Sequence, residues 1–255
     1  MLEVRDVSKS YGGVNALSSV SFAVEAGEVV GYLGPNGAGK STTVKVVTGM
    51  IEPTSGDVFF MERSIKNRKR EYQASIGYVP EEPFIYQHLS GLEHLQLVGR
   101  LRNMEESQIH RRANALLEVL HLGTSRHSQI GSYSKGMKQR ILIAGSLIHN
   151  PSLLIFDEPL SGLDVTTANI FRHLLVELAA AGKAVLYISH QLEVVEQICK
   201  RVIILKGGVV SANGSPEYLM KAFGCSDLNE VFIKIADEPD AQRPAKEILE
   251  IMCSQ

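Results

Sequence analysis

The chain has 255 residues, a formal net charge of −2, and 44% hydrophobic and 21% charged residues. These proportions are ordinary for a globular protein, and they exclude a disordered tail, a coiled coil and a collagen-like chain. A chain of this length can bury a core without disulfide or metal support, and its near-zero charge gives no general attraction to nucleic acid or anionic lipid.

The cysteines and the apolar segments indicate a reduced protein that does not cross a membrane by itself. The three cysteines, Cys199, Cys225 and Cys253, form no C-x-x-C pair, which predicts free thiols as in a cytosolic protein. The first residues carry charges and no apolar segment, so no signal peptide is expected. The longest mostly apolar run, residues 141–148, is far shorter than the ~20 residues of a membrane helix.

The first third alternates short apolar segments with turns, which is typical of strands. Strands are predicted over Val29–Leu33, Val58–Phe60 and Ile76–Val79. A helix is predicted over Thr42–Thr48, directly after a glycine-rich loop.

The middle of the chain changes to a helical pattern. From Leu89 to Leu120 the apolar residues recur at helical spacing, and Ser90 and Ser107 are candidate N-caps. This segment is predicted to be a helical insert between two halves of an α/β core.

The last part returns to alternating strands and helices. Strands are predicted over Leu153–Phe156, Val185–Ser189 and Val202–Leu205, and helices over Val165–Ala181 and Leu192–Cys199. Further along, the sequence predicts a hairpin turn at Gly207-Gly208, a helix start at Ser215-Pro216 and a surface helix over Asp237–Gln255. Alternating strands and helices favour a mostly parallel sheet covered by helices, so the predicted fold class is α/β.

The segment Gly34–Ser41 matches the pattern G-x-x-x-x-G-K-[ST] at every fixed position, between a predicted strand and a predicted helix. Glycines allow backbone N–H groups to turn toward phosphate oxygens, and the helix N-terminus adds a positive dipole end. Lys40 is predicted to reach the β- and γ-phosphates, and the Ser41 hydroxyl to bind Mg²⁺. The alternative is a glycine-rich turn that binds nothing, and the complete match with its flanks argues against it.

The segment Leu153–Glu158 is an apolar strand that ends in two acids. Burial of unpaired charge costs free energy, so two adjacent carboxylates at the end of a buried strand indicate a functional role. In a P-loop protein, Asp157 is expected in the Mg²⁺ shell, and Glu158 is expected to orient or deprotonate the attacking water. The alternative is a strand that simply exits into solvent, and the upstream P-loop argues against it.

With these motifs the chain resembles the ATP-binding subunit of an ABC transporter over nearly its whole length. The segment Ser132–Arg140 stands at the family's signature, Asp157-Glu158-Pro159 ends its second Walker motif, and Ser161–Asp164 matches its D-loop. His190 matches the switch histidine, and Tyr11 stands where the family places an aromatic ring against adenine.

The resemblance implies the ABC ATPase fold, which is a P-loop NTPase core with a mostly parallel sheet, an N-terminal antiparallel β part and a helical insert. It implies an ABC ATPase domain over residues 1–225, with a helical subdomain at about 83–150 inserted in a RecA-like core. Residues 226–255 are then a short C-terminal extension.

The resemblance also implies ATP and Mg²⁺ as cofactors. It implies catalytic roles for Glu158, His190 and Lys40, and metal binding by Ser41, Asp157 and Glu81. The residues expected to bind the nucleotide are Tyr11, Gly34, Pro35, Asn36, Gly37, Ala38, Gly39, Lys40, Ser41, Thr42, Ser134, Gly136 and Asp164.

Partners and location follow from the same resemblance. Two cassettes, as a homodimer or as a heterodimer with a second ATPase subunit, are expected to close head to tail on ATP, and no nucleic acid partner is expected. A separate transmembrane permease would take up the movement, which implies a cytoplasmic protein on the inner face of the cell membrane. Within the helical insert, Pro83–Leu101 is expected to contact the permease.

Two departures from the family pattern are informative. The signature has Lys135 in place of the first glycine and Met137 in place of the glutamine, which resembles ABC-2 exporters of drugs, lipids or polymers, as does Leu228–Lys234. Glu81 stands where a glutamine is usual. An ionised glutamate only accepts hydrogen bonds but can bind Mg²⁺, so Glu81 is predicted to keep a metal-sensing role.

Two other functions stay open from the residues. One is a soluble ABC-type ATPase that acts on ribosomes or DNA, against which stand a single cassette, the lack of a long heptad run and the near-neutral charge. The other is a non-hydrolysing regulatory partner, against which stands the complete set of Lys40, Asp157, Glu158 and His190. The remaining histidines show no metal-ligand spacing, and Arg68–Arg70 is predicted to be a solvated loop.

Overall fold

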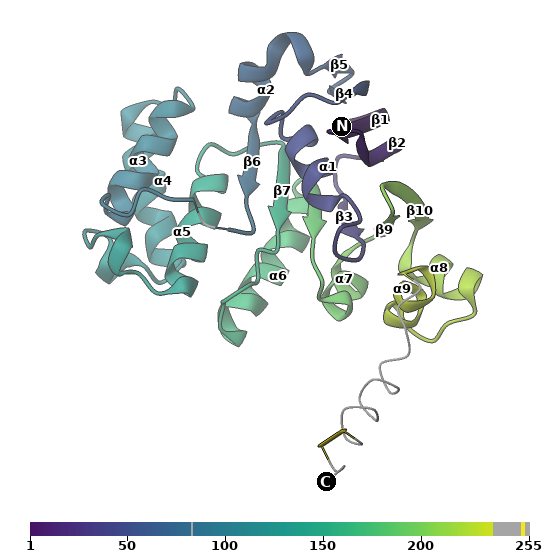
Figure 1. Cartoon of the computed structure of the whole chain (residues 1–255). Coiled ribbons are helices and arrows are strands. Elements are labelled where there is room, and N and C mark those ends of the chain that lie inside the picture. The colour runs from purple at the N-terminus through teal and green to yellow at the C-terminus, as the bar shows by residue number, and fades with distance from the viewer. Residues whose placement is uncertain (83, 237–250, 253–255) are drawn as a thin grey trace.

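A small antiparallel sheet at the N-terminus has the strand order β2-β1-β4-β5 (Figure 1). The structure is a computed structural model, which describes residues 1–82, 84–236 and 251–252. The strands of this sheet are β1 (Leu2–Tyr11), β2 (Val14–Val24), β4 (Ser55–Phe60) and β5 (Arg63–Ser64). Because β1 pairs with both β2 and β4, its apolar residues reach the centre of the sheet.

A larger sheet has the order β10-β9-β3-β8-β7-β6, and its neighbours pair in parallel except for the hairpin of β9 and β10. Its strands are β3 (Val29–Leu33), β6 (Ile76–Val79), β7 (Leu153–Asp157), β8 (Ala184–Ile188), β9 (Arg201–Lys206) and β10 (Val209–Gly214). Every residue of β3, β7 and β8 is buried, which explains why these strands have continuous apolar sequences. The predicted α/β class with a mostly parallel sheet is confirmed.

Helices connect the strands and cover the larger sheet (Figure 1). They are α1 (Lys40–Val47), α2 (Lys69–Ser75), α3 (Gly91–Leu101), α4 (Glu106–Val119), α5 (Lys135–Leu147), α6 (Val165–Ala180), α7 (Leu192–Ile198), α8 (Pro216–Phe223) and α9 (Leu228–Ala236). Short 3₁₀ turns lie at Lys66–Arg68, Gly123–Ser125 and Ile130–Ser132.

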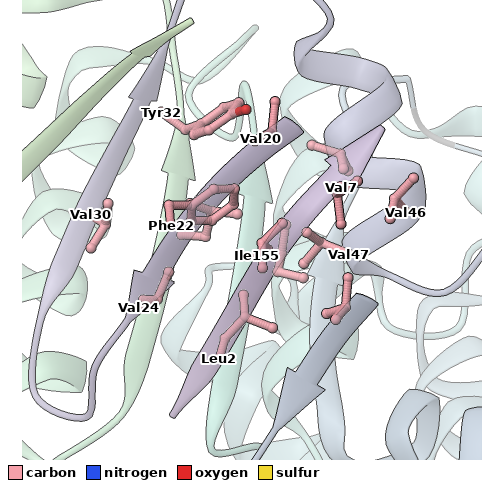
Figure 2. Packing of buried hydrophobic residues seen from close by; sticks show 14 of the residues in the cluster. Leu2, Val7, Val20, Phe22, Val24, Val30, Tyr32, Val46, Val47 and Ile155 are labelled. Carbon is pink, nitrogen blue, oxygen red and sulfur yellow. The ribbon is translucent and has the colours of Figure 1, made fainter. Parts of the chain in front are cut away.

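Alternate residues of β3 point into different hydrophobic cores, as expected for a strand covered on both faces. Val30 and Tyr32 lie in the core between the two sheets and α1, whereas Val29 and Leu33 lie in the core under α6 and α7. Figure 2 shows the first of these cores, in which apolar side chains of both sheets meet those of α1. This packing fixes the loop between β3 and α1 at both of its ends.

The helices α3, α4 and α5 lie together at one side of the larger sheet and share a hydrophobic core of their own (Figure 1). Leu95, Leu117 and Ile141, one from each helix, are fully buried there. Outside this core, α5 contacts the segment that follows β7, where the Gln139 amide nitrogen donates to the Pro159 carbonyl oxygen.

The helical pattern over Leu89–Leu120 forms two helices, α3 and α4. The helix α3 ends at Leu101, and Asn103 adopts a left-handed φ of +55° before α4 starts. Ser90 is confirmed as an N-cap, since its hydroxyl accepts a hydrogen bond from the Glu93 N–H in a capping box. Ser107 as an N-cap is wrong, because Glu105 occupies the cap position of α4.

Other local predictions also have clear outcomes. The Gly207-Gly208 turn is confirmed, with both residues at positive φ, and Ser215 caps α8. The helix predicted from Thr42 starts at Lys40 instead, because the glycine loop runs directly into it. Arg68–Arg70 is not a loop but part of a 3₁₀ turn and α2, where the Arg68 guanidinium donates to the Phe60 carbonyl. The predicted helix over 237–255 lies, apart from residues 251–252, outside the described residues, as does Cys253.

His94 makes the stability of the helical group depend on pH. It is 8% exposed on α3, against Gly145 of α5, and burial lowers its pKa to about 4. Between about pH 6.5 and 4 the unfolded chain binds a proton here that the folded chain does not. The folded state therefore has its full stability above this range and loses stability as the pH falls through it. We expect His94 to remove about 3 kcal/mol of the unfolding free energy over this range.

The measurement is urea unfolding of the wild type and the His94→Gln variant at pH 7 and pH 4.5. We expect the variant to lose less stability than the wild type on acidification, whatever its stability at pH 7. The exposed His173 of α6 provides the control, His173→Gln, which keeps the wild-type difference. Equal acid sensitivity of the wild type and His94→Gln would contradict the prediction.

Candidate nucleotide site

The loop Gly34–Gly39 connects the end of β3 to the start of α1, and two of its positions, 34 and 39, have room only for glycine. A Cβ on Gly34 would lie 2.4 Å from the Leu205 carbonyl oxygen, and one on Gly39 would lie 2.6 Å from that of Ala16. Gly39 also has a φ of +106°, a left-handed conformation that side chains disfavour. These two glycines therefore allow the loop to pack closely against both sheets with its backbone turned inward.

The N-terminus of α1 has no side-chain cap and no acidic residue in its first turn. Its first N–H groups consequently remain available to an anion. The Lys40 ammonium donates hydrogen bonds to the carbonyl oxygens of Gly34 at 2.6 Å and Pro35 at 3.2 Å. Burial lowers the pKa of Lys40, and the nearby carboxylates of Glu158, Asp157 and Glu81 oppose this shift.

A cavity of about 240 Å³ opens in front of this helix end. It brings together most of the predicted site residues, from four separate parts of the sequence. Its lining consists of Ala16, Asn36, Gly37, Ala38, Gly39, Lys40, Ser41, Thr42, Glu81, Asp157, Glu158, Ile188 and His190.

The two acids at the end of β7, Asp157 as its last residue and Glu158 directly after it, are held in this cavity by the backbone. Glu158 has a φ of +49°, and its N–H donates a 3.0 Å hydrogen bond to the Ile188 carbonyl. Burial raises the pKa of Asp157 to about 6, with a further rise from Glu81 and an opposing effect of Lys40. Burial also raises the pKa of Glu158 to about 7, against a hydrogen bond to the His190 backbone that lowers it. Both carboxylates are therefore easier to protonate than in water.

Glu158 faces two groups from the end of β8. The His190 Nε2 lies 3.6 Å from Glu158 Oε1, and the Ser189 hydroxyl lies 3.5 Å from Oε2. Oε1 is buried and makes no hydrogen bond to any residue that the structure describes. An oxygen left in this way is suited to a water molecule or a ligand group in the cavity.

The same residues fit a nucleotide-bound Mg²⁺ better than a protein-only metal site. Among the described residues, no group of three or more His, Cys, Asp or Glu side chains is arranged to hold a metal ion. Mg²⁺ in nucleotide sites usually takes one or two protein ligands and completes its shell with phosphates and water. The Ser41 hydroxyl and the buried Asp157 carboxylate line one cavity and match this requirement.

The remaining predicted residues lie outside the cavity. The Tyr11 ring is 47% exposed at the end of β1, with the Lys9 ammonium 5.3 Å from its centre. Ser134 caps α5 by accepting a hydrogen bond from the Met137 N–H, and Asp164 caps α6. Gly136 lies in the first turn of α5. These four residues are not among the described residues that line the cavity, so their nucleotide contacts stay predictions. Gly34 and Pro35 do not line it either, but their carbonyl oxygens accept hydrogen bonds from Lys40.

Some residues in or beside the cavity are not part of the sequence motifs. Ala16 and Ile188 line the cavity, and neither belongs to a motif. Ser189 stands directly before the predicted His190, and its closeness to Glu158 follows only from the folded strand.

A protein-family model described as ABC transporter matches residues 17–161, more than half of the chain. The chain belongs to the ABC transporter family. It is 34% identical to the ABC transporter ATP-binding protein NatA of Bacillus subtilis, over 91% of this chain and 97% of that protein. It is also 34% identical to the Nod factor export ATP-binding protein I of Cupriavidus pinatubonensis, over 95% of this chain and 74% of that protein.

Solved structures of ABC cassettes share the fold. An ATP-binding subunit of an ABC transporter superposes with a TM-score of 0.88 at 34% identity, over 92% of this chain and 99% of that chain. A dimeric cassette in a post-hydrolysis state with ADP and Pi has a TM-score of 0.78 at 27% identity, over 84% and 98%. This chain is therefore an ABC ATPase cassette that binds nucleotide and hydrolyses ATP. Among its described residues, no helix is long and apolar enough to span a bilayer.

The Lys40→Met variant tests the cavity as the nucleotide site. Lys40 is the one lysine among the described residues that line the cavity, so we expect loss of its ammonium to lower nucleotide affinity and ATPase rate by about 100-fold or more, as for loss of a buried phosphate contact. The control is Lys45→Met, an exposed lysine on the same helix, with unchanged activity. Titration with a fluorescent ATP analogue and a phosphate-release assay measure both effects. Equal behaviour of the two variants would remove Lys40 from the site.

Proposed function

We propose that this cassette powers an exporter whose membrane-spanning part is a separate chain. The observation that carries the proposal is the single cavity in which the P-loop, Asp157, Glu158 and His190 meet. Support for export comes from relatives that are named as a Nod factor export ATP-binding protein and a linearmycin resistance ATP-binding protein, each 34% identical to this chain. The Lys135 and Met137 variant of the signature favours the same direction.

In this proposal the backbone N–H groups of the loop and of α1 bind the phosphates. The Lys40 ammonium, which now contacts loop carbonyls, turns to the β- and γ-phosphates. Ser41 and Asp157 would hold Mg²⁺, with Glu81 at the same cavity, and the ion would neutralise phosphate charge. These groups orient the γ-phosphate and stabilise the charge that develops on it.

Glu158 is the proposed general base for the attacking water. Its pKa near 7 lies close to neutral pH, where a base combines a useful ionised fraction with a strong affinity for a proton. His190, 3.6 Å from Oε1, is placed to orient the carboxylate and to contact the γ-phosphate. We assign these roles from the cavity geometry together with the family resemblance.

The residues outside the cavity are proposed to act across a head-to-tail dimer, either a homodimer or a heterodimer. Ser134 and Gly136 at the start of α5 would contact the γ-phosphate of ATP on the partner, and Asp164 would contact the partner chain. Tyr11 would stack on adenine. A dimeric cassette with ADP and Pi among the similar structures supports this arrangement.

We place the cassette in the cytoplasm, on the inner face of the cell membrane, with its permease on the side of α3. Phe84 and Tyr86 are 85% and 59% exposed between β6 and α3, and Leu101 is 68% exposed at the end of α3. Exposed aromatic and aliphatic side chains of this kind suit a protein partner. Pro83, at the start of the predicted contact segment, lies outside the described residues.

The Glu158→Gln variant tests the assembly. It keeps the shape of the side chain but removes the base, so ATP is expected to trap a closed dimer with a hydrolysis rate lowered by about 100-fold or more. The tagged variant is purified from detergent-solubilised cells with ATP, and mass spectrometry identifies its partners. We expect a polytopic membrane protein among these partners. Ribosomal proteins or DNA-repair factors without a membrane chain would contradict the exporter and support a soluble ABC-type ATPase.

The Glu81→Gln variant tests the metal-sensing role. Without Mg²⁺ the Glu81 carboxylate repels the phosphates, so its neutralisation is expected to tighten binding of metal-free ATP by about tenfold. With Mg²⁺ the variant should bind ATP no better and need more Mg²⁺ for half-maximal ATPase rate. ATP affinity is measured in EDTA and over a Mg²⁺ series, with the exposed neighbour in Glu82→Gln as control. An unchanged Mg²⁺ dependence and ATPase rate in Glu81→Gln would remove it from the metal site.

A further inference from the structure

The first turns of α5 pack against residues 159–162, the segment that directly follows Glu158. The Gln139 side chain is 3% exposed, and its amide nitrogen donates a 3.0 Å hydrogen bond to the Pro159 carbonyl oxygen. A Cβ on Gly136 would lie 2.8 Å from the carbonyl oxygen of Gly162. The signature and the D-loop of one chain are therefore in direct contact, with no space for a side chain between them.

Lys135, which replaces the family's usual glycine, extends this contact on its exposed side. Its ammonium donates a 3.1 Å hydrogen bond to the Ser161 hydroxyl. Its carbon chain lies over Gly162, where a Cβ would be 2.8 Å from Lys135 Cδ and 2.9 Å from Cγ. Gly162 has a φ of +79°, so a glycine suits both the backbone conformation and the lysine that covers it.

The position of Lys135 at the start of α5 favours a hydrogen bond between its ammonium and an acceptor outside the helix. Lys135 is the first residue of α5, where the helix dipole presents its positive end and disfavours a cation. No acidic residue lies in the first turn to offset this charge. The Ser161 hydroxyl is the side-chain oxygen that accepts from the ammonium. The interaction thus draws the lysine away from the helix axis and toward the D-loop.

We propose that Lys135 is a positioning residue that ties the signature to the D-loop of the same chain. When Ser134 and Gly136 engage ATP on a partner cassette, the movement of α5 passes through Ser161 and Gly162 to Glu158. This inference rests on the proposed head-to-tail dimer. Small displacements of a catalytic base change the rate strongly, so the contact acts on the hydrolysis step rather than on nucleotide binding.

The first test compares the ATPase kinetics of full-length Lys135→Met, Lys135→Arg and Ser161→Ala. Methionine keeps most of the carbon chain over Gly162 but has no donor, whereas arginine keeps charge and donor. We expect Lys135→Met and Ser161→Ala each to lower kcat by about three- to tenfold with an unchanged KM for ATP, the factor that corresponds to one hydrogen bond. Lys135→Arg should keep the wild-type kcat.

The double variant Lys135→Met/Ser161→Ala shows whether the two residues act together. If they share one contact, its kcat equals that of the lower single variant instead of the product of both losses. The matched control is Lys183→Met, because the Lys183 ammonium also bridges two segments, donating a 2.8 Å hydrogen bond to the Asn150 side chain away from the site. This control should leave kcat unchanged.

Amide hydrogen exchange of the nucleotide-free protein tests the contact without relying on turnover. The Ser161 and Leu163 N–H groups donate to the carbonyls of Glu158 and Leu160, so they report on the order of this segment. We expect faster exchange over residues 159–164 in Lys135→Met and no change there in Lys183→Met.

Several results would overturn the proposal. The first three are an unchanged kcat in Lys135→Met, multiplicative losses in the double variant, and wild-type exchange over residues 159–164 in Lys135→Met. The fourth is a raised KM with an unchanged kcat, which would assign the ammonium to nucleotide binding. A wild-type protein that hydrolyses ATP but forms no trapped dimer with Glu158→Gln would instead contradict the proposed assembly. In that case the exchange experiment still decides whether Lys135 holds the D-loop.

Discussion

The parallel pairing of β3, β8 and β7 is the constraint on which the site depends. Ile188 of β8 lies opposite Tyr32 of β3 and opposite Asp157 of β7, so the three strands end at the same edge of the sheet. The loops that leave this edge carry the phosphate-binding glycines, Glu158 and His190. Open α/β sheets bind ligands at this edge because parallel strands deliver their connecting loops there together. The burial of all three strands then holds the register.

The cavity at this edge has an excess of negative charge among the described residues that line it. Lys40 stands beside Glu81, Asp157 and Glu158, yet its hydrogen bonds go to the loop carbonyls. The raised pKa values of Asp157 and Glu158 reflect the cost of holding these carboxylates out of water and near each other. A nucleotide with its Mg²⁺ would match this arrangement, because the carboxylates would hold the cation and the N–H groups at the helix end would bind the phosphates. The same balance is the reason that Glu81, which lines this cavity, is proposed to sense the metal.

The sequence was informative where local chemistry determines structure. Continuous apolar runs identified β3, β6 and β7, and the glycine pattern located the phosphate loop, because these signals lie within a few neighbouring residues. The boundaries of α3 and α4 were not predictable from apolar spacing, since the spacing continues through Asn103 while the backbone does not. Glu105 rather than Ser107 precedes α4 because the turn after α3, not cap preference, sets where the helix begins.

The other features that the sequence did not predict depend on contacts between distant parts of the chain. The motifs named Glu158 and His190, but the placement of Ala16 and Ser189 beside them depends on how the sheets pack. Likewise, the motifs located the signature and the D-loop separately. Their contact through Gln139 and Pro159 joins residues 20 positions apart in the sequence, so it is visible only in the folded chain.

This contact also explains how the signature tolerates a lysine. At Gly162 the absence of a side chain leaves room for the carbon chain of Lys135, and the ammonium finds an acceptor one residue earlier. Gly136 cannot vary in the same way, because the Gly162 carbonyl occupies the position of its Cβ. The two neighbouring positions therefore differ in what surrounds them. Position 135 accepts a long side chain that strengthens the link to the D-loop, whereas position 136 is restricted to glycine by that same link.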